Sequence, residues 1–211
     1  DGSPIKGAKK RKYRLGHQDV GKRVRVRVTA RRDGYTPATA VSPRRKVGHR
    51  IGVRATVTYR VETRGRISTS LADFRRQARE TYADPRGWRN AGVRFREVGR
   101  GGDFSLVLSE ASRVPSFSSV CSSYYSCRVG RFVVINQDRW KHATPSWKAA
   151  SGDLRGYRHM VVNHETGHWL GHGHRGCPGK GPAPVMMQQS KGLHGCQHNP
   201  WPLASELWFR R

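Results

Sequence analysis

Residues 164–174 read HETGHWLGHGH and constrain the fold more than any other part of the chain. On a helix, His164 and His168 lie one turn apart on the same face, and Gly171 permits a left-handed turn that returns His174 toward them. Three neutral imidazoles leave the fourth position of a tetrahedral zinc ion open, as in catalytic sites. Glu165 stands beside the first ligand, where a carboxylate can serve as general base. The spacing predicts one catalytic Zn²⁺; surface histidines on an ordinary helix are the alternative.

The helix that carries this motif is expected to begin after Asp153, which is a good N-cap residue. Leu154, Tyr157 and Val161 recur at helical spacing, and the first two motif histidines continue their stripe. The stripe therefore aims these histidines into the molecule. His172 lies off the ligand spacing and is expected to face solvent.

The motif resembles that of the metzincin clan of zinc peptidases, in which a methionine lies in a tight turn beneath the metal. The segment APVMMQQS at 183–190 supplies Met186 and Met187 for this turn, and Met187 is favoured because an apolar residue precedes it. Snapalysin-type proteases are a more distant likeness, because they carry aspartate where this chain has His174. Astacin- and serralysin-like members place a tyrosine after the turn, whereas Gln188 and Gln189 stand here.

The segments HETGHWLGH, PVMMQQ and NPWP occur in this order along the chain. In this order they more closely resemble a secreted bacterial family of unknown function, number 3152, and the resemblance covers roughly residues 50–211.

The pattern of apolar residues from Val53 onward predicts an α+β domain. Strands are expected at 53–62, 93–98, 103–110 and 130–137, and a helix from Ser70 to a point before Pro85. Periodicity alone indicates a mixed sheet with a covering helix. The resemblance implies a metzincin-like zincin domain over 47–211, with a twisted mixed sheet, two main helices and an irregular C-terminal subdomain.

Residues 1–46 differ in composition and resemble the C-terminal half of a bacterial immunoglobulin-like repeat. In this interpretation Val24, Val26 and Val28 face a core while the intervening arginines face water. Two or three strands are too few to be stable without a partner sheet, so a basic, disordered arm is the alternative. The segment SPRRKVGHR at 42–50 is expected to link the two parts.

The four cysteines indicate an oxidising compartment. Cys121 and Cys127 flank SSYYS, whereas Cys177 and Cys196 bracket the two methionines, and neither pair has the spacing of a redox motif. Pairing 121–127 and 177–196 is one of three possible connectivities and keeps each loop local. We expect two disulfides in a secreted or cell-surface protein; free structural thiols are the alternative.

The chain is strongly basic, with 41 Lys and Arg against 14 Asp and Glu and a net charge of +27. Such a charge favours polyanions, including anionic cell-wall polymers. The arginines alternate with apolar residues along expected strands, and no nucleic-acid-binding motif accompanies them. We therefore expect a solvated basic surface without specific nucleic-acid binding. The sequence has no apolar run that could span a bilayer, and a monomer is expected.

The function expected from these features is hydrolysis of peptide bonds in protein or peptide substrates by a zinc-bound water that Glu165 activates. By resemblance to the clan, the strand at 130–137 is expected to be an edge strand that binds an extended substrate through Arg131, Phe132, Val133 and Val134; an ordinary buried strand is the alternative. Two other functions stay open. One is a cell-wall or polyanion-binding module with a vestigial zinc site, and the other is a zinc amidase acting on peptidoglycan peptides.

Overall fold

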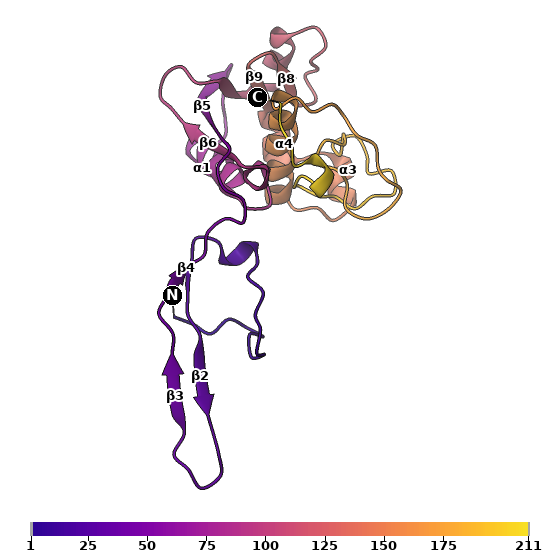
Figure 1. The fold of residues 1–211 in the computed structure, drawn as a ribbon. Coiled ribbons are helices and arrows are strands. Elements are labelled where there is room, and N and C mark those ends of the chain that lie inside the picture. The colour runs from indigo at the N-terminus through magenta and orange to yellow at the C-terminus, as the bar shows by residue number, and fades with distance from the viewer. Residues whose placement is uncertain (1, 211) are drawn as a thin grey trace. The chain divides into compact units, whose positions relative to one another are not determined.

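The computed structural model describes residues 2–210 and separates into two compact units, residues 1–50 and residues 51–211 (Figure 1). The boundary falls four residues after the expected one at 46/47. Each unit has its own internal pairing and is described separately. No helix in the described part of the chain is long and apolar enough to cross a membrane.

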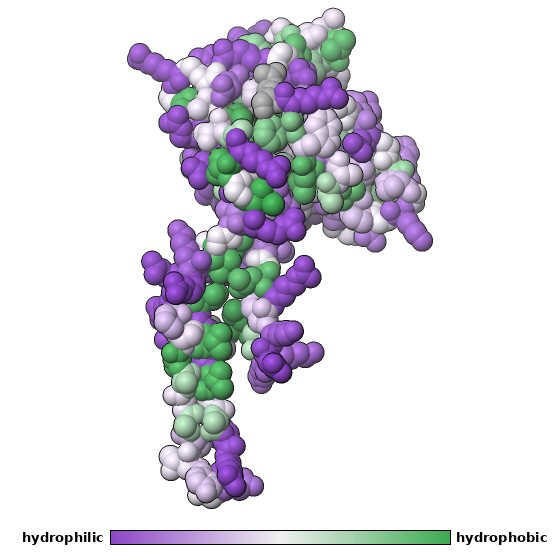
Figure 2. All heavy atoms as spheres, in the orientation of Figure 1, coloured by the Kyte–Doolittle hydropathy of each residue, from purple (hydrophilic) through white to green (hydrophobic). Residues whose placement is uncertain are grey.

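The first unit consists of two short antiparallel ribbons. Strand β1 (Arg23–Val24) pairs with β4 (Arg45–Lys46), and β2 (Arg27–Ala30) pairs with β3 (Ala38–Val41); a single 3-10 turn, η1 (His17–Asp19), precedes them. The prediction of a valine core is wrong here. Val26 and Val28 are 63% and 60% exposed, because among the described residues of this unit each ribbon is a two-stranded sheet without a covering sheet. Hydrophobic residues are accordingly visible at the surface of this unit (Figure 2). The immunoglobulin-like interpretation stays a prediction.

The second unit is built on a five-stranded sheet with the order β6-β5-β7-β9-β8. The strands are β5 (Ala55–Arg64), β6 (Val93–Glu97), β7 (Phe104–Ser109), β8 (Cys127–Val129) and β9 (Phe132–Asn136). β6, β5, β7 and β9 run parallel, whereas β8 is antiparallel to β9. The predicted mixed sheet and the α+β class are confirmed.

Both faces of the central strand β7 are buried. Phe104, Leu106 and Leu108 point to the layer that contains the two long helices, whereas Val107 packs with Val114 on the other face. A 3-10 helix, η3 (Ala111–Phe117), supplies this second cover. A strand buried on both sides has no solvent-facing row of charged residues, which agrees with the uncharged sequence FSLVLS.

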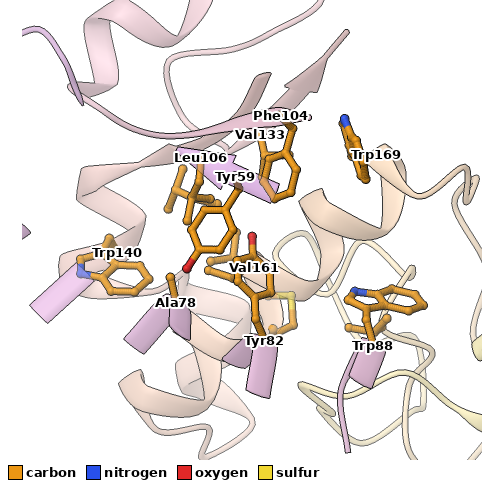
Figure 3. Packing of buried hydrophobic residues seen from close by; sticks show 14 of the residues in the cluster. Tyr59, Ala78, Tyr82, Trp88, Phe104, Leu106, Val133, Trp140, Val161 and Trp169 are labelled. Atoms are coloured by element: carbon orange, nitrogen blue, oxygen red, sulfur yellow. The ribbon is translucent and has the colours of Figure 1, made fainter. Parts of the chain in front are cut away.

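Two long helices cover one face of the sheet. Helix α1 (Leu71–Ala83) begins where the Ser70 side chain accepts a hydrogen bond from the Asp73 amide, as predicted, and it buries Phe74, Ala78 and Tyr82. Helix α4 (Leu154–Trp169) packs beside it. The labelled side chains of Tyr59, Leu106, Tyr82 and Val161 meet between the sheet and these helices (Figure 3).

The remaining elements are short. They are η2 (Trp88–Ala91), α2 (Gln137–His142), α3 (Pro145–Ala149) and η4 (Ala204–Glu206). Residues 170–203 contain no long helix or strand, and one isolated bridge joins Pro182 to Gln197. An irregular C-terminal region was expected from the resemblance, and this stretch follows directly on the end of α4 that carries the histidines.

Candidate metal centre

Helix α4 presents the first two histidines of the motif to the interior. Its N-cap is Asp153, whose carboxylate accepts a hydrogen bond from the Gly156 amide. Tyr157 and Val161 lie in the core on the same stripe, and His164 follows them with only 8% of its surface exposed. His168, one turn later, is half-buried. The helix therefore holds both imidazoles at the end of its buried face, as its period predicts.

The chain leaves α4 through a turn at Gly171 that brings back the third histidine. Gly171 has a φ of 103°, a left-handed conformation that other residues rarely adopt. The amide of Gly171 donates to the His168 carbonyl, and the amide of His172 donates to that of Gly167. His174 then lies beside the helix, with its ring centroid 4.5 Å from that of His168.

The three histidines form a compact cluster. Ligand nitrogens of His164, His168 and His174 all lie within 4.8 Å of one another, and this is the one group of at least three such residues within positions 2–210. The Nε2 atoms of His168 and His174 are 3.1 Å apart. Two imidazole nitrogens on a tetrahedral zinc are about 3.3 Å apart, given bonds of about 2.0 Å. The donor set and this spacing fit a divalent metal ion such as zinc.

Hydrogen bonds to backbone carbonyls fix the protonation of two ligands. Nδ1 of His164 lies 2.8 Å from the Val185 oxygen, and Nδ1 of His168 lies 2.9 Å from the His172 oxygen. A carbonyl oxygen only accepts, so each Nδ1 carries the proton and each Nε2 keeps its lone pair for a metal. Burial also lowers the pKa of His164 to about 3 and that of His168 to about 4, which keeps both rings neutral.

Glu165 is the buried carboxylate of the centre. It is 6% exposed and lines the same pocket as the three histidines. Burial raises the pKa of Glu165 to about 8, and the Arg128 guanidinium opposes this shift. Like Arg128, a cation held by the three imidazoles would lower the pKa of Glu165 from this raised value, since a positive charge favours the ionised carboxylate. The carboxylate is thus placed to exchange a proton near neutral pH.

The turn with the two methionines packs beneath the helix. The Met187 amide donates to the Pro184 carbonyl across this turn. Met186 belongs to the main core: a Cβ added at Gly167, between the first two ligands, would lie 2.3 Å from its sulfur. Met187 instead packs with Ala183 and the second disulfide. Met186 therefore lies against the metal-binding stretch of α4 at Gly167, and the choice of methionine beneath a bound metal stays a prediction.

Both expected disulfides are present. Cys121 is bonded to Cys127, and Cys177 to Cys196. The first closes the loop that leads into β8, and the second closes the loop that contains both methionines. These bonds indicate an oxidising or extracellular environment.

A pocket of about 630 Å³ opens over the histidines and Glu165. One side is formed by β8 and the loop before it, including Tyr125 and Arg128, and another by residues after the methionine turn, including Lys191. The guanidinium of Arg128 donates to the His168 carbonyl at 2.8 Å. The pocket thus brings together an edge strand, the ligand helix and the irregular C-terminal region.

The expected edge strand is wrong. β9, which contains Phe132, Val133 and Val134, lies between β7 and β8 and has hydrogen-bonded partners on both sides. Its backbone therefore has no free edge for a substrate, and neither these residues nor Arg131 line the pocket. β8 occupies the edge instead. β8 is three residues long, Cys-Arg-Val beside a disulfide, and so short a strand has no period that sequence analysis could detect.

His172 is a second correction. It is 4% exposed rather than solvent-facing, with its ring between Trp88 and Trp208. Its Nε2 lies 2.9 Å from the Trp208 oxygen, and its backbone oxygen is the partner of His168. The backbone of His172 therefore holds the His168 ring, whereas its own side chain is not one of the three clustered histidines. The tryptophans that enclose it are distant in sequence, so spacing within the motif gave no signal for this role.

Comparison with known proteins places the chain in a family but gives no function. No curated protein and no solved structure matches it. Residues 38–199, well over half of the chain, match the family described as protein of unknown function DUF3152. The matched range contains the three histidines, Glu165, both methionines and all four cysteines. The chain therefore belongs to the DUF3152 family.

Proposed function

We propose that this protein is a secreted zinc-dependent endopeptidase of the metzincin type. The observation that carries the proposal is the joint placement of three neutral imidazoles and one buried carboxylate in the wall of a single open pocket. A structural zinc site is closed by four protein ligands, and it has no use for a general base. The methionine turn under α4 and the antiparallel strand at the sheet edge support the metzincin assignment.

His164, His168 and His174 would hold the zinc through their Nε2 atoms. When bound, the ion supplies Lewis acidity that polarises a scissile carbonyl and makes water more acidic. The Val185 and His172 carbonyls keep the first two rings in the orientation and tautomer that binding requires.

Glu165 would act as the proton carrier. Its carboxylate accepts a proton from the attacking water, and the same group then delivers that proton to the departing amine nitrogen. Only 6% of the surface of Glu165 is exposed, and the residue lines the pocket, so we expect it to exchange protons with groups bound there.

β8 would bind the substrate. It is the terminal strand of the sheet, its inner side is paired with β9, and it borders the pocket through Cys127 and Arg128. An extended peptide can add to such an edge through main-chain hydrogen bonds, which give affinity with little dependence on side chains. The disulfide Cys121–Cys127 and the Arg128 bond to His168 hold this edge against the ligand helix.

The test is hydrolysis of casein and of a mixed peptide library by the zinc-loaded protein. We expect activity that a chelator abolishes and added zinc restores. Glu165→Gln should keep zinc and fold but lose activity by about 10²- to 10⁴-fold, because the proton acceptor is gone. Glu62→Gln, which removes a carboxylate outside the pocket, should leave activity unchanged. Near-normal turnover by Glu165→Gln would contradict the assigned base.

The strong positive charge supports two rival functions, a wall- or polyanion-binding module with a vestigial zinc site and an amidase acting on peptidoglycan peptides. The same proteins separate them. Chelator-sensitive release of stem peptides from peptidoglycan without casein cleavage favours the amidase. Tight binding of wall polymer by Glu165→Gln and wild type alike, with no hydrolysis of either substrate, favours the binding module.

A further inference from the structure

A buried carboxylate lies behind the metal centre, outside the pocket. Glu206 has none of its surface exposed and belongs to residues 203–210, here called the C-terminal segment. Its two oxygens accept three backbone hydrogen bonds: from the amides of Val185 at 2.9 Å, Met186 at 2.9 Å and Leu203 at 2.8 Å. A buried charge is tolerated only when it is hydrogen-bonded, and these three donors satisfy the carboxylate. Two of them belong to the methionine turn.

One peptide group connects this carboxylate to a metal ligand. The amide of Met186 donates to Glu206 Oε1, and the carbonyl of the same peptide unit, that of Val185, accepts from Nδ1 of His164 at 2.8 Å. A hydrogen bond at one end of a peptide group polarises the bond at the other end. The negative charge of Glu206 therefore makes the Val185 oxygen a stronger acceptor, and this fixes the His164 ring and its tautomer.

The C-terminal segment also reaches the second ligand. The Trp208 oxygen lies 2.9 Å from Nε2 of His172, and the backbone oxygen of His172 lies 2.9 Å from Nδ1 of His168. The amide of Arg210 donates to the Leu170 carbonyl, next to the turn that leads to His174. The rings of His164 and His168 are thus held by backbone carbonyls that contacts from the C-terminal segment keep in place.

We propose that Glu206 is a positioning residue of the metal centre, which acts on His164 through the Val185–Met186 peptide group, and that residues 203–210 are part of the centre. This inference rests on the metal site proposed above. It extends the site beyond residue 199, where the family match ends. Glu206 does not touch the pocket, so its effect is on ligand geometry and metal affinity rather than on substrate.

The experiment measures zinc affinity by competition with a chromogenic chelator, at a temperature where the metal-free proteins are folded by circular dichroism. Glu206→Gln should weaken zinc binding by about 10- to 100-fold, the usual effect of losing an outer-shell partner. Glu206→Asp keeps the negative charge on a shorter side chain, and its zinc affinity should lie between that of Glu206→Gln and that of the wild type. Glu110→Gln is the matched control, because Glu110 also accepts a backbone amide, that of Arg66, but outside the metal pocket; it should bind zinc normally.

A second readout separates positioning from general destabilisation. In the metal-free protein, imidazole nitrogen NMR should show His164 as one fixed Nδ1–H tautomer, and Glu206→Gln should mix the two tautomers while Glu110→Gln should not. Zinc affinity within twofold of wild type in a folded Glu206→Gln protein would overturn the proposal. If that variant does not fold, Glu206→Asp decides by the same criteria. Failure of the wild type to bind zinc would instead refute the proposed function, so the two failures are distinct.

Discussion

The guanidinium of Arg128 donates a 2.8 Å hydrogen bond to the His168 carbonyl and so joins the edge strand directly to the ligand helix. Lys191 also lines this pocket, and its ammonium lies 5.5 Å from the centre of the Tyr125 ring. Glu165 is the one carboxylate among the described residues of the pocket wall. Apart from Glu165, the charged side chains that line the pocket, Arg128 and Lys191, are positive.

We expect peptides with Asp or Glu next to the scissile bond to be cleaved with a lower KM than matched alanine peptides. Lys191→Ala should raise the KM for the acidic peptide about fivefold and leave that for the neutral peptide unchanged, because an exposed ion pair contributes at most about 1 kcal/mol. Lys180→Ala, which removes a lysine outside the pocket, is the control. Equal KM values for acidic and neutral peptides would exclude this charge preference.

Replacing His174 by alanine should lower zinc affinity by at least about 100-fold, because two-histidine sites hold zinc poorly. His142→Ala, at an exposed position, should bind zinc as the wild type does. Equilibrium dialysis with metal analysis gives the result. Full occupancy in the His174 variant would mean that another residue completes the site.

Loss of the disulfide Cys177–Cys196 should destabilise the protein by about 3 kcal/mol, the chain-entropy value for a loop of about 20 residues. The double variant to serine should also bind zinc more weakly, because Met187 and the turn pack on this disulfide. Chemical denaturation and zinc competition measure the two effects. Removing Cys121–Cys127, which closes a shorter loop, should cost only about 2 kcal/mol. An unchanged zinc affinity in the first variant would contradict the link to the metal centre.

Acidification should destabilise the fold through His159. Burial lowers the pKa of His159 to about 4, an effect that Arg155 and Arg86 reinforce and that Asp84 and Glu80 oppose. The unfolded chain binds the proton near pH 6.5, so this contribution to stability is complete above pH 6.5 and is lost as the pH falls toward 4.

The variant His159→Gln isolates this effect. Thr81 donates its hydroxyl proton to the Gln77 carbonyl, so the His159 ring donates to Thr81, and a glutamine amide can replace that donor. Between pH 7 and pH 4.5 the metal-free wild type should lose about 2 kcal/mol more unfolding free energy than the variant. Urea denaturation at each pH tests this, and parallel pH curves for the two proteins would contradict it.

Polyanion binding should be non-specific. With a net charge of +27, the protein should bind DNA or teichoic-acid-like polymers at low salt, and affinity should fall steeply between 50 and 200 mM salt as counterion release weakens. Fluorescence anisotropy with two unrelated DNA sequences measures it. Sequence-selective binding that survives 150 mM salt would show a dedicated nucleic-acid site.

The sequence predicts the long elements of the domain well because each repeats a pattern over many residues. α1 and α4 begin at the expected N-caps Ser70 and Asp153, and β5, β6, β7 and β9 lie within their predicted ranges apart from a shift at the end of β5. The edge was predicted wrongly. Whether a strand is terminal depends on a partner that lies elsewhere in the chain, and for β9 that partner is the three-residue β8.

At the candidate metal site, the cluster of His164, His168 and His174 was predictable, because metal-ligating histidines recur at a fixed spacing on a helix and the turn that follows it. The residues that hold these histidines in place could not be predicted from the sequence. Glu206 stands in the sequence SEL, which has no pattern that indicates burial, and its burial and three amide donors are seen only in the structure. His172 was misplaced for the same reason, since two tryptophans distant in sequence enclose it.

Gly167 has a consequence for protein engineering. A Cβ at this position would lie 2.3 Å from the Met186 sulfur and 2.8 Å from the Trp88 ring, so neither neighbour leaves room for alanine. Metal binding alone sets no residue type at position 167, so here it is packing against Met186 and Trp88 that favours glycine. A designer who grafts this histidine motif onto another scaffold would need to transfer Trp88 and Met186 with it, or refill the space beneath the helix.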